Sequence, residues 1–572
     1  MTTLSTGIDR FVSFPSGFTT AILPAWSQEN VLWLLIVGFI VGFILAFAVG
    51  ANDVANSFGT TVGAKVLTLK QACVLATVFE TTGAALVGAK VGETIRKGII
   101  DVHVYDFEDG AKVLMMGEVA AMFGAAMWQI IATILKIPVS GTHSIVGACI
   151  GFSLVAVGSS GVHWASLGFI VASWFVSPVL AGFMAVLLYY FTQRFIISKD
   201  DPLKTGLLAL PFFYAFTVGV NVFSILYSGA PLLGLDNLPI WSILLMALGV
   251  MLLVAITTRL IAVPKIRSRA EKFQNERDGK SCTTELTSLH YSVKDEIETI
   301  SPDSKKKVTF GSRSVKVTHS ERSLQNSRKE SSEVLKEIVM SDHRDENFDE
   351  ASPFTVQLTS SSDSEFSLNE CGTSDMEKSQ TSKSSIQKKE VKVTELDEND
   401  EEDPATVREL FSSLQVLTAC FASFAHGGND VSNAIGPLIA LWIIFWSGEV
   451  VQKAFTPWYL LLYGGLGITV GLWLLGRRVM ETIGKDLTKV TPSRGFCIEL
   501  MTAFTVLVAS NLGIPISTTH CKVGAVVSIG WYRSRSAVEW SIVRNIACAW
   551  FVTVPVAGLF SAGAMHLLMR FL

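Results

Sequence analysis

The sequence predicts an all-α polytopic membrane protein with about 12 transmembrane helices, two inverted repeats, and some re-entrant or broken helices. Three observations lead to this fold class. Of 572 residues, 49% are hydrophobic and only 17% are charged, whereas soluble proteins carry about 25% charge. Apolar runs of spanning length recur, and two polar motifs each occur twice at one fixed separation. This composition excludes an ordinary soluble enzyme, a disordered scaffold and a coiled coil.

Apolar runs are the elements of the predicted bundle, since a membrane helix needs about 20 predominantly apolar residues. The runs lie near 31–50, 68–90, 112–136, 140–160, 165–192, 207–229, 238–263, 410–426, 434–446, 456–476, 496–512, 514–532 and 541–571. Small and polar residues interrupt the starts of 140–160 and 514–532, so we expect these two to be re-entrant or broken.

A polar segment divides the chain into two membrane halves. Residues 1–264 form the half with the first repeat, and residues 408–572 form the half with the second. Between them, residues 265–407 are rich in Ser, Thr, Lys, Glu and Asp, which predicts a disordered loop. Basic residues from Lys265 to Lys272 follow the seventh run and favour the cytoplasm for this loop. Both termini are then expected outside the cell.

The internal repeat consists of two pairs of matching motifs. Phe47–Asn56 parallels Phe424–Asn433, and Ile137–His143 parallels Ile514–His520, both at a separation of 377 residues. One short match could arise by chance, but two at a shared separation indicate a duplicated unit. An odd number of crossings between the copies predicts opposite orientations, as in many secondary transporters. A duplicated membrane scaffold without a transport role is the alternative.

The first motif of each copy places Asn-Asp-x-x-Asn inside an apolar segment. On a helix, Asn52, Asp53 and Asn56 face one locus, because residues three and four apart are neighbours. A carboxylate at membrane depth is costly and rarely a packing residue. Oxygen-rich clusters suit hard cations such as sodium, although an amide and carboxyl network that joins helices is the alternative. The candidate sodium ligands in the motifs are Asp53, Asn56, Asp430 and Asn433. Glu80 and Glu499, which also lie within apolar sequence, are further candidate sodium ligands or gates, or could instead face a polar connection.

The second motif of each copy, Pro-x-Ser-x-Thr-His, predicts the start of a helix within the membrane. Free N–H groups and hydroxyls at such a terminus make an anion cradle, and two opposed cradles could hold one tetrahedral oxyanion. A capped kink is the alternative. Phosphate at neutral pH can donate a proton to a carboxylate, whereas sulfate cannot, so the chemistry favours phosphate. The hydroxyls belong to Ser140, Thr142, Ser517, Thr518 and Thr519.

Each of three histidines near the motifs allows two interpretations of its role. His143 and His520 end the second motifs, and His426 precedes Gly427 in the second copy. Each could take part in transport or could only hydrogen-bond within the bundle. Ser and His three residues apart without an oriented base do not form a catalytic triad, so the sequence predicts that the protein is not an enzyme.

The sequence resembles the inorganic phosphate transporter (PiT) family, in particular its animal members, the type III sodium-dependent phosphate transporters. The resemblance rests on Gly50–Asn56, Gly427–Asn433 and the paired Pro-x-Ser-x-Thr-His segments. It implies symport of monovalent phosphate with sodium into the cell, across the plasma membrane, by alternating access. It also implies a phosphate site formed by Asn52, Asp53, Ser140, Gly141, Thr142, Asn429, Asp430, Ser517, Thr518 and Thr519.

Partners and alternatives complete the sequence-based expectations. We expect phosphate, sodium as co-substrate and the lipid bilayer as partners, no covalent cofactor and, with a net charge of -4, no nucleic acid. A homodimer and binding of regulatory proteins or kinases to the loop are left open. A proton-coupled phosphate carrier and a nutrient sensor that signals through the loop are the competing functions.

Overall fold

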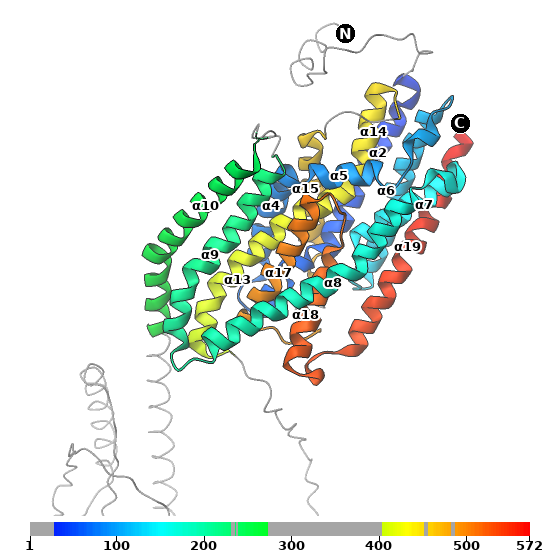
Figure 1. Ribbon diagram of the computed structural model, residues 1–572. Coiled ribbons are helices and arrows are strands. Elements are labelled where there is room, and N and C mark those ends of the chain that lie inside the picture. Colours follow the sequence, from blue (N-terminus) through cyan, green and yellow to red (C-terminus); the bar gives the residue numbers. More distant parts are fainter. Residues whose placement is uncertain are drawn as a thin grey trace, which may run out of the picture. The chain divides into compact units, whose positions relative to one another are not determined.

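The computed structural model describes residues 28–229, 235, 238–272, 403–450, 456–481 and 487–571. Apart from one isolated bridge between Ile100 and Val162, the regular elements of these residues are helices (Figure 1). The all-α fold class is therefore confirmed. Most of the predicted loop, residues 273–402, lies outside the described residues, while its two ends are helical.

The helices follow the predicted runs closely. In the first half they are α2 Gln28–Asp53, α3 Ala55–Gly63, α4 Leu69–Val87, α5 Ala89–Lys97, α6 Gly110–Ile134, α7 Gly141–Ala156, α8 Trp164–Thr192, α9 Pro202–Tyr227 and α10 Ile240–Thr257. In the second half they are α13 Ala405–His426, α14 Ser432–Ser447, α15 Trp458–Leu475, α16 Arg477–Glu481, α17 Pro492–Asn511, α18 Thr518–Arg533 and α19 Trp540–Leu568.

Nine helical segments of the described chain are long and apolar enough to cross a membrane, or ten if the bent pair α4 and α5 counts as one. The multi-pass character is thus clear, and the count of about 12 stays a prediction. Residues 410–426 and 434–446, expected as separate runs, form one segment from Thr406 to Ser447. They join because a π-helical turn at Gly427–Val431 continues the helix through the polar motif.

The exterior of the bundle is apolar. On α10, Leu245, Leu252 and Leu253 are 63–65% exposed, and on α8 Phe169 is 79% exposed. Surface of this kind is unfavourable in water and is expected of helices that face lipid. The polar side chains of the repeated motifs lie instead between the helices.

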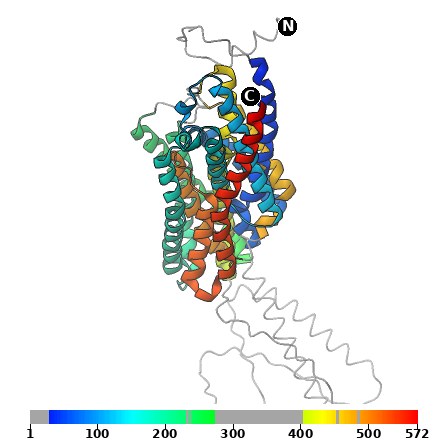
Figure 2. The same cartoon turned by 90° about the vertical axis from the view of Figure 1, so that its right-hand side faces the viewer.

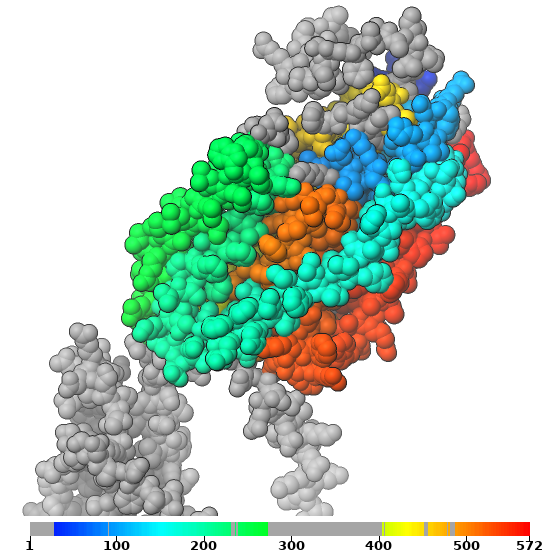
Figure 3. All heavy atoms as spheres, in the orientation of Figure 1, coloured from blue at the N-terminus to red at the C-terminus, as the bar shows by residue number. Residues whose placement is uncertain are grey.

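Helices in the two halves correspond in length and in packing. α7 and α18 have 16 residues each, and α8 and α19 have 29 each. α19 packs along α7 while α8 packs along α18 (Figure 1), and Figure 3 shows α8 crossing the face of α17 and α18. The start of α2 and the end of α19 lie at the same end of the bundle (Figure 2). The inverted orientation of the copies stays a prediction.

Candidate functional site

Each first motif lies at an irregularity in a helix. In the first copy, α2 ends at Asp53 and α3 begins at Ala55. In the second copy, Gly427–Val431 form the π-helical turn. The glycines are needed for close packing: a Cβ on Gly50 would lie 2.0 Å from the carbonyl oxygen of Ile468, and one on Gly427 would lie 2.1 Å from that of Glu80. Neighbouring backbones thus fix both motifs deep in the bundle.

Each second motif begins a helix, as its sequence predicts. The Ser140 hydroxyl accepts a hydrogen bond from the His143 N–H at 3.3 Å and caps α7. In the second copy, the Ser517 hydroxyl accepts from the His520 N–H at 3.1 Å and caps α18. Serine suits this position because its oxygen satisfies an N–H that the first turn leaves free.

Matched hydrogen bonds tie the two copies to each other. The Asn56 amide donates to Thr519 Oγ1 at 2.8 Å, and the Asn433 amide donates to Thr142 Oγ1 at 2.8 Å. Each threonine in turn donates across the copies, Thr519 to the Val139 carbonyl at 3.2 Å and Thr142 to the Ile516 carbonyl at 3.0 Å. The first motif of one copy therefore meets the second motif of the other.

The two motif aspartates are both buried, at 1% exposure, and have different neighbours. Asp53 accepts a bond from the Gly141 N–H at 3.0 Å, and its Oδ1 lies 3.4 Å from Oγ1 of Thr519. Asp430 accepts from the Thr518 hydroxyl at 2.6 Å, and its carboxylate lies 2.8 Å from Nε2 of His426. Thr518 stands 377 residues after Gly141, so a hydroxyl in one copy replaces an N–H in the other.

The amide groups of the first motifs hold the chain before each second motif. Asn52 donates to Thr133 and to the Ile137 carbonyl, both at 3.0 Å, and accepts from the Val139 N–H at 3.0 Å. Asn429 donates to the Ile516 carbonyl at 3.0 Å. Both asparagines, predicted to bind phosphate, therefore also position the cradle.

Three amide oxygens of the motifs have no hydrogen-bond partner among the described residues. They are the Oδ1 atoms of Asn56, Asn429 and Asn433, all buried. Buried polar atoms are normally paired, so each of these oxygens keeps lone pairs that a cation or a hydrogen-bond donor could take up.

Glu80 and His426 extend the charged group around Asp430. The Ser423 hydroxyl donates to Glu80 at 3.3 Å, and Nδ1 of His426 lies 3.3 Å from Oε1 of Glu80. The imidazole thus stands between two carboxylates, Glu80 on α4 and Asp430 on the π-helical turn. The structure brings these predicted residues together with the second copy's motif.

His143 and His520 pack against each other and against two tryptophans. His143 stacks on Trp174 with ring centroids 3.6 Å apart, and His520 packs on Trp550 at 3.6 Å. The two imidazoles lie 4.4 Å from each other, and Nδ1 of His520 is 3.0 Å from the Trp174 carbonyl oxygen. A transport role for either histidine stays a prediction.

Glu499 lies in a separate polar cluster that also contains a residue missed by the sequence analysis. The hydroxyls of Thr60 and Thr61 both donate to its Oε1 at 2.6 Å, and Lys522 donates to Thr60 at 2.9 Å. Lys522 is fully buried in α18. A lysine inside an apolar segment was the signal that could have identified it.

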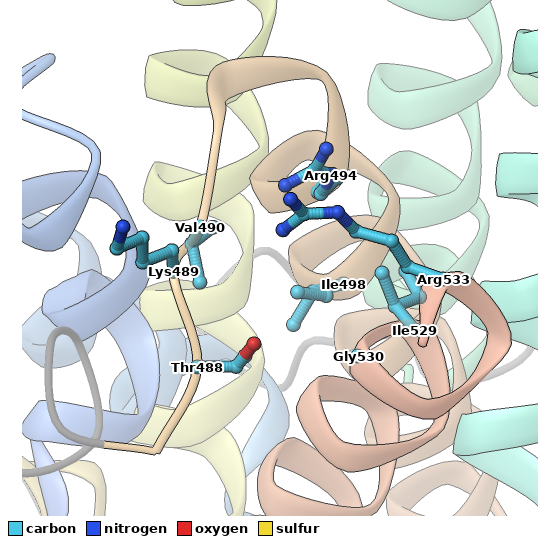
Figure 4. Close-up of a pocket in the computed structure, with 8 residues that line it drawn as sticks. All are labelled: Thr488, Lys489, Val490, Arg494, Ile498, Ile529, Gly530 and Arg533. Atoms are coloured by element: carbon cyan, nitrogen blue, oxygen red, sulfur yellow. The ribbon is translucent and has the colours of Figure 1, made fainter. Parts of the chain in front are cut away.

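Two small cavities adjoin these regions. One is lined by Asn56, Ser57, His426, Thr502 and Thr518 among others, and so opens on the motif network. The other, at the ends of α17 and α18, is basic and includes Lys489, Arg494 and Arg533, whose side chains Figure 4 shows. Sequence analysis did not predict the second cavity.

An apolar helical bundle with a buried polar site, shared by two matched motifs, defines a multi-pass membrane transport protein. Comparison with known proteins agrees. A model of the Phosphate transporter family matches residues 49–561. The chain therefore belongs to the phosphate transporter family, whose members are transporters and not enzymes.

Individual relatives cover nearly the whole chain. Sodium-dependent phosphate transporter 2 of Felis catus is 45% identical over 647 aligned positions, covering 95% of this chain and 98% of the relative. Sodium-dependent phosphate transporter 1-A of Danio rerio is 43% identical, covering 96% and 97%. A solved structure described as the sodium-dependent phosphate transporter is 30% identical, with a TM-score of 0.66, covering 94% of this chain and 100% of its own.

Proposed function

We propose that this protein carries inorganic phosphate, in its monovalent form, into the cell together with sodium, by alternating access across the plasma membrane. Family membership and the names of the relatives support the substrate and the coupling ion. The observation that carries the proposal is the matched pair of cross-copy bonds from Asn56 to Thr519 and from Asn433 to Thr142. These bonds join the two copies into one site.

Phosphate fits between the N-termini of α7 and α18. Their first turns present the positive ends of two helix dipoles, which favour an anion. The threonine hydroxyls at these ends donate to Ile516, Asp430 and Val139 in this structure and would turn to donate to phosphate when it binds. The monovalent ion keeps protons that it can donate to a carboxylate. The proposed phosphate ligands are Asn52, Asp53, Ser140, Gly141, Thr142, Asn429, Asp430, Ser517, Thr518 and Thr519.

Sodium resolves the charge conflict in this site. Asp53 and Asp430 would repel an anion in a buried setting, where charges interact strongly. A sodium ion beside each aspartate removes that repulsion and takes up the lone pairs of Asn56 and Asn433, whose Oδ1 atoms lack partners. Binding of phosphate then depends on binding of sodium, which is the basis of coupling.

The arrangement of the helix ends supports the proposed topology. α2 begins and α19 finishes at one end of the bundle, whereas α10 runs toward the other end, where α13 begins (Figure 1). Basic residues between Lys265 and Lys272 favour the cytoplasm for that second end. Both termini would then be extracellular, and the loop between the halves cytoplasmic.

The direct test is phosphate uptake with sodium replaced by choline, in cells that make the protein. We expect uptake to require sodium, and to rise at fixed total phosphate as the medium becomes more acidic, because the monovalent fraction grows. Uptake that is indifferent to sodium and driven by protons would instead identify a proton-coupled carrier. His426 between Glu80 and Asp430 makes that competitor worth measuring in the same assay.

A further inference from the structure

The cluster around Glu499 is a second buried polar centre, and none of its residues is among the proposed phosphate ligands. Besides Thr60 and Thr61, the Gln415 amide donates to Oε1 at 3.3 Å and the Thr418 hydroxyl donates to Oε2 at 3.0 Å. The donors come from α3 and α13, while Glu499 itself belongs to α17. Its carboxylate is fully buried and accepts four side-chain hydrogen bonds.

Lys522 completes this centre with the opposite charge. Its Nζ donates to the Thr60 hydroxyl at 2.9 Å, and that hydroxyl donates to Glu499 at 2.6 Å. The ammonium and the carboxylate are therefore separated by a single bridging oxygen. A buried ammonium is stable only when an anion compensates it, and Glu499 is the carboxylate that this hydrogen-bond chain reaches.

The same groups would otherwise form a site for a hard cation. A carboxylate, three threonine hydroxyls and an amide are the oxygen donors that such ions prefer. One of these donors, Oε1 of Gln415, is buried and has no hydrogen-bond partner among the described residues. The centre thus holds the ligand set of a sodium site, with a lysine ammonium at its edge.

The position of Lys522 connects this centre to the phosphate site. On α18 it follows Thr518 and Thr519 by four and three residues, which places all three side chains on one face of the helix. In the first copy, the positions 377 residues earlier than Gln415, Glu499 and Lys522 are Gly38, Met122 and Ile145. The amide, the carboxylate and the ammonium of this centre therefore have no counterparts in the first copy.

We propose that the Lys522 ammonium is the resident cation of the Glu499 centre and takes the place of a sodium ion there. Glu499, predicted from the sequence as a sodium ligand, is then neutralised within the protein and adds no sodium to the transport cycle. The proposal rests on the proposed function only in assuming that sodium is the cation the site would take.

The experiment counts sodium ions bound to the purified full-length protein, by equilibrium binding of radiolabelled sodium without phosphate. Lys522→Met is expected to bind one sodium ion more than the unchanged protein, because the Glu499 oxygens then need a new cation. Lys522→Arg keeps the charge and is expected to bind the same number. Lys522→Met combined with Glu499→Gln removes both charges and is also expected to return to the original number.

Two outcomes would overturn the proposal. One is a folded Lys522→Met protein, judged by size-exclusion chromatography and helical circular dichroism, that binds no additional sodium. The other is Glu499→Gln alone binding one sodium fewer than the unchanged protein, which would make Glu499 a sodium ligand. If Lys522→Met does not fold, the number of sodium ions bound by Glu499→Gln still shows whether Glu499 is a sodium ligand. The assay contains no phosphate and measures no transport. The number of bound sodium ions can therefore be interpreted even if the proposed transport function is wrong.

Discussion

The two copies of the motif pair share their hydrogen-bond frame and differ in their charges. In both, an asparagine amide bonds to the threonine of the other copy at 2.8 Å, and that threonine bonds to a backbone carbonyl across the copies. Asp53 has a backbone N–H and a hydroxyl as neighbours. Asp430 has His426 and, through that ring, Glu80.

This difference suggests separate roles: the shared hydrogen bonds would hold the ligand, and the unequal charged neighbours would control its binding. A shared frame suits a single ion bound between equivalent helix termini, since both halves then contribute the same groups. A histidine and a second carboxylate beside only one of the two aspartates give the two sides of the site unequal electrostatics. We therefore expect mutations in the frame to have equal effects in both copies, and mutations of the carboxylates to have unequal ones.

The largest effect is expected from the aspartates. Asp430→Asn should lower the initial rate of phosphate uptake by about 100-fold or more, because removing one partner of a buried charged network costs roughly 3–5 kcal/mol. Asp53→Asn should cost about tenfold or somewhat more, since its one hydrogen bond from the Gly141 N–H to a charged acceptor is worth roughly 1.5–3 kcal/mol. Rates are compared per molecule at the cell surface, measured by biotinylation. Equal losses would contradict the asymmetry.

The next-largest effects are expected at Gly141 and Thr518, which occupy matching positions in the two copies. A Cβ on Gly141 would lie 2.8 Å from Oδ2 of Asp53, so Gly141→Ala must displace that carboxylate. Thr518→Ala removes the hydroxyl that donates to Asp430 at 2.6 Å. We expect each to lower uptake about tenfold, as lost bonds to charged groups cost about 1.5–3 kcal/mol. Thr518→Ser should restore uptake; failure of this rescue would assign Thr518 a packing role only.

Smaller effects on uptake, equal in the two copies, are expected from the asparagines whose hydrogen bonds join the copies. Asn56→Ala and Asn433→Ala each remove one neutral hydrogen bond between the copies, which is worth about 1 kcal/mol, or roughly fivefold in rate. Both should also raise the sodium concentration needed for half-maximal uptake, because each loses an oxygen proposed as a sodium ligand. A strong loss from one variant and none from the other would show that the copies do not share the site.

The smallest effect is expected from changes to the loop that joins the two halves of the chain. Replacing residues 273–402 with a flexible Gly/Ser linker of about 30 residues should leave uptake per surface molecule unchanged, because no motif residue lies in that segment. A nutrient sensor that works through the loop would lose its signal instead. The same cells can report both readouts, and loss of uptake with normal surface expression would count against the transporter account.

Local patterns could be predicted from the sequence, while contacts across the bundle could not. The caps at Ser140 and Ser517 were predictable because cap preference depends on adjacent residues. The exchange that pairs Asn56 with Thr519 instead of Thr142 depends on how distant helices pack. For the same reason, the Lys522 contact with Thr60 was not foreseen.

Hydropathy also misjudged one element, and the reason is physical. Polar residues and glycines at Gly427–Val431 lower the local hydropathy and suggested a break between two runs. The backbone there remains helical, because a π-helical turn absorbs the irregularity within one segment. Composition reports the cost of polar groups in a membrane, whereas helix continuity depends on backbone hydrogen bonds, which composition does not record.

The most direct test of a single site shared by both copies is the number of phosphate ions bound per chain, measured by equilibrium binding of radiolabelled phosphate in sodium. Our account predicts one phosphate per chain, and loss of that binding in both Thr142→Val and Thr519→Val. Ser153→Ala, which removes a hydroxyl bonded to Tyr105 outside the site, is the control and should retain binding. Two phosphates per chain, or loss of binding from only one of the threonine variants, would contradict the account.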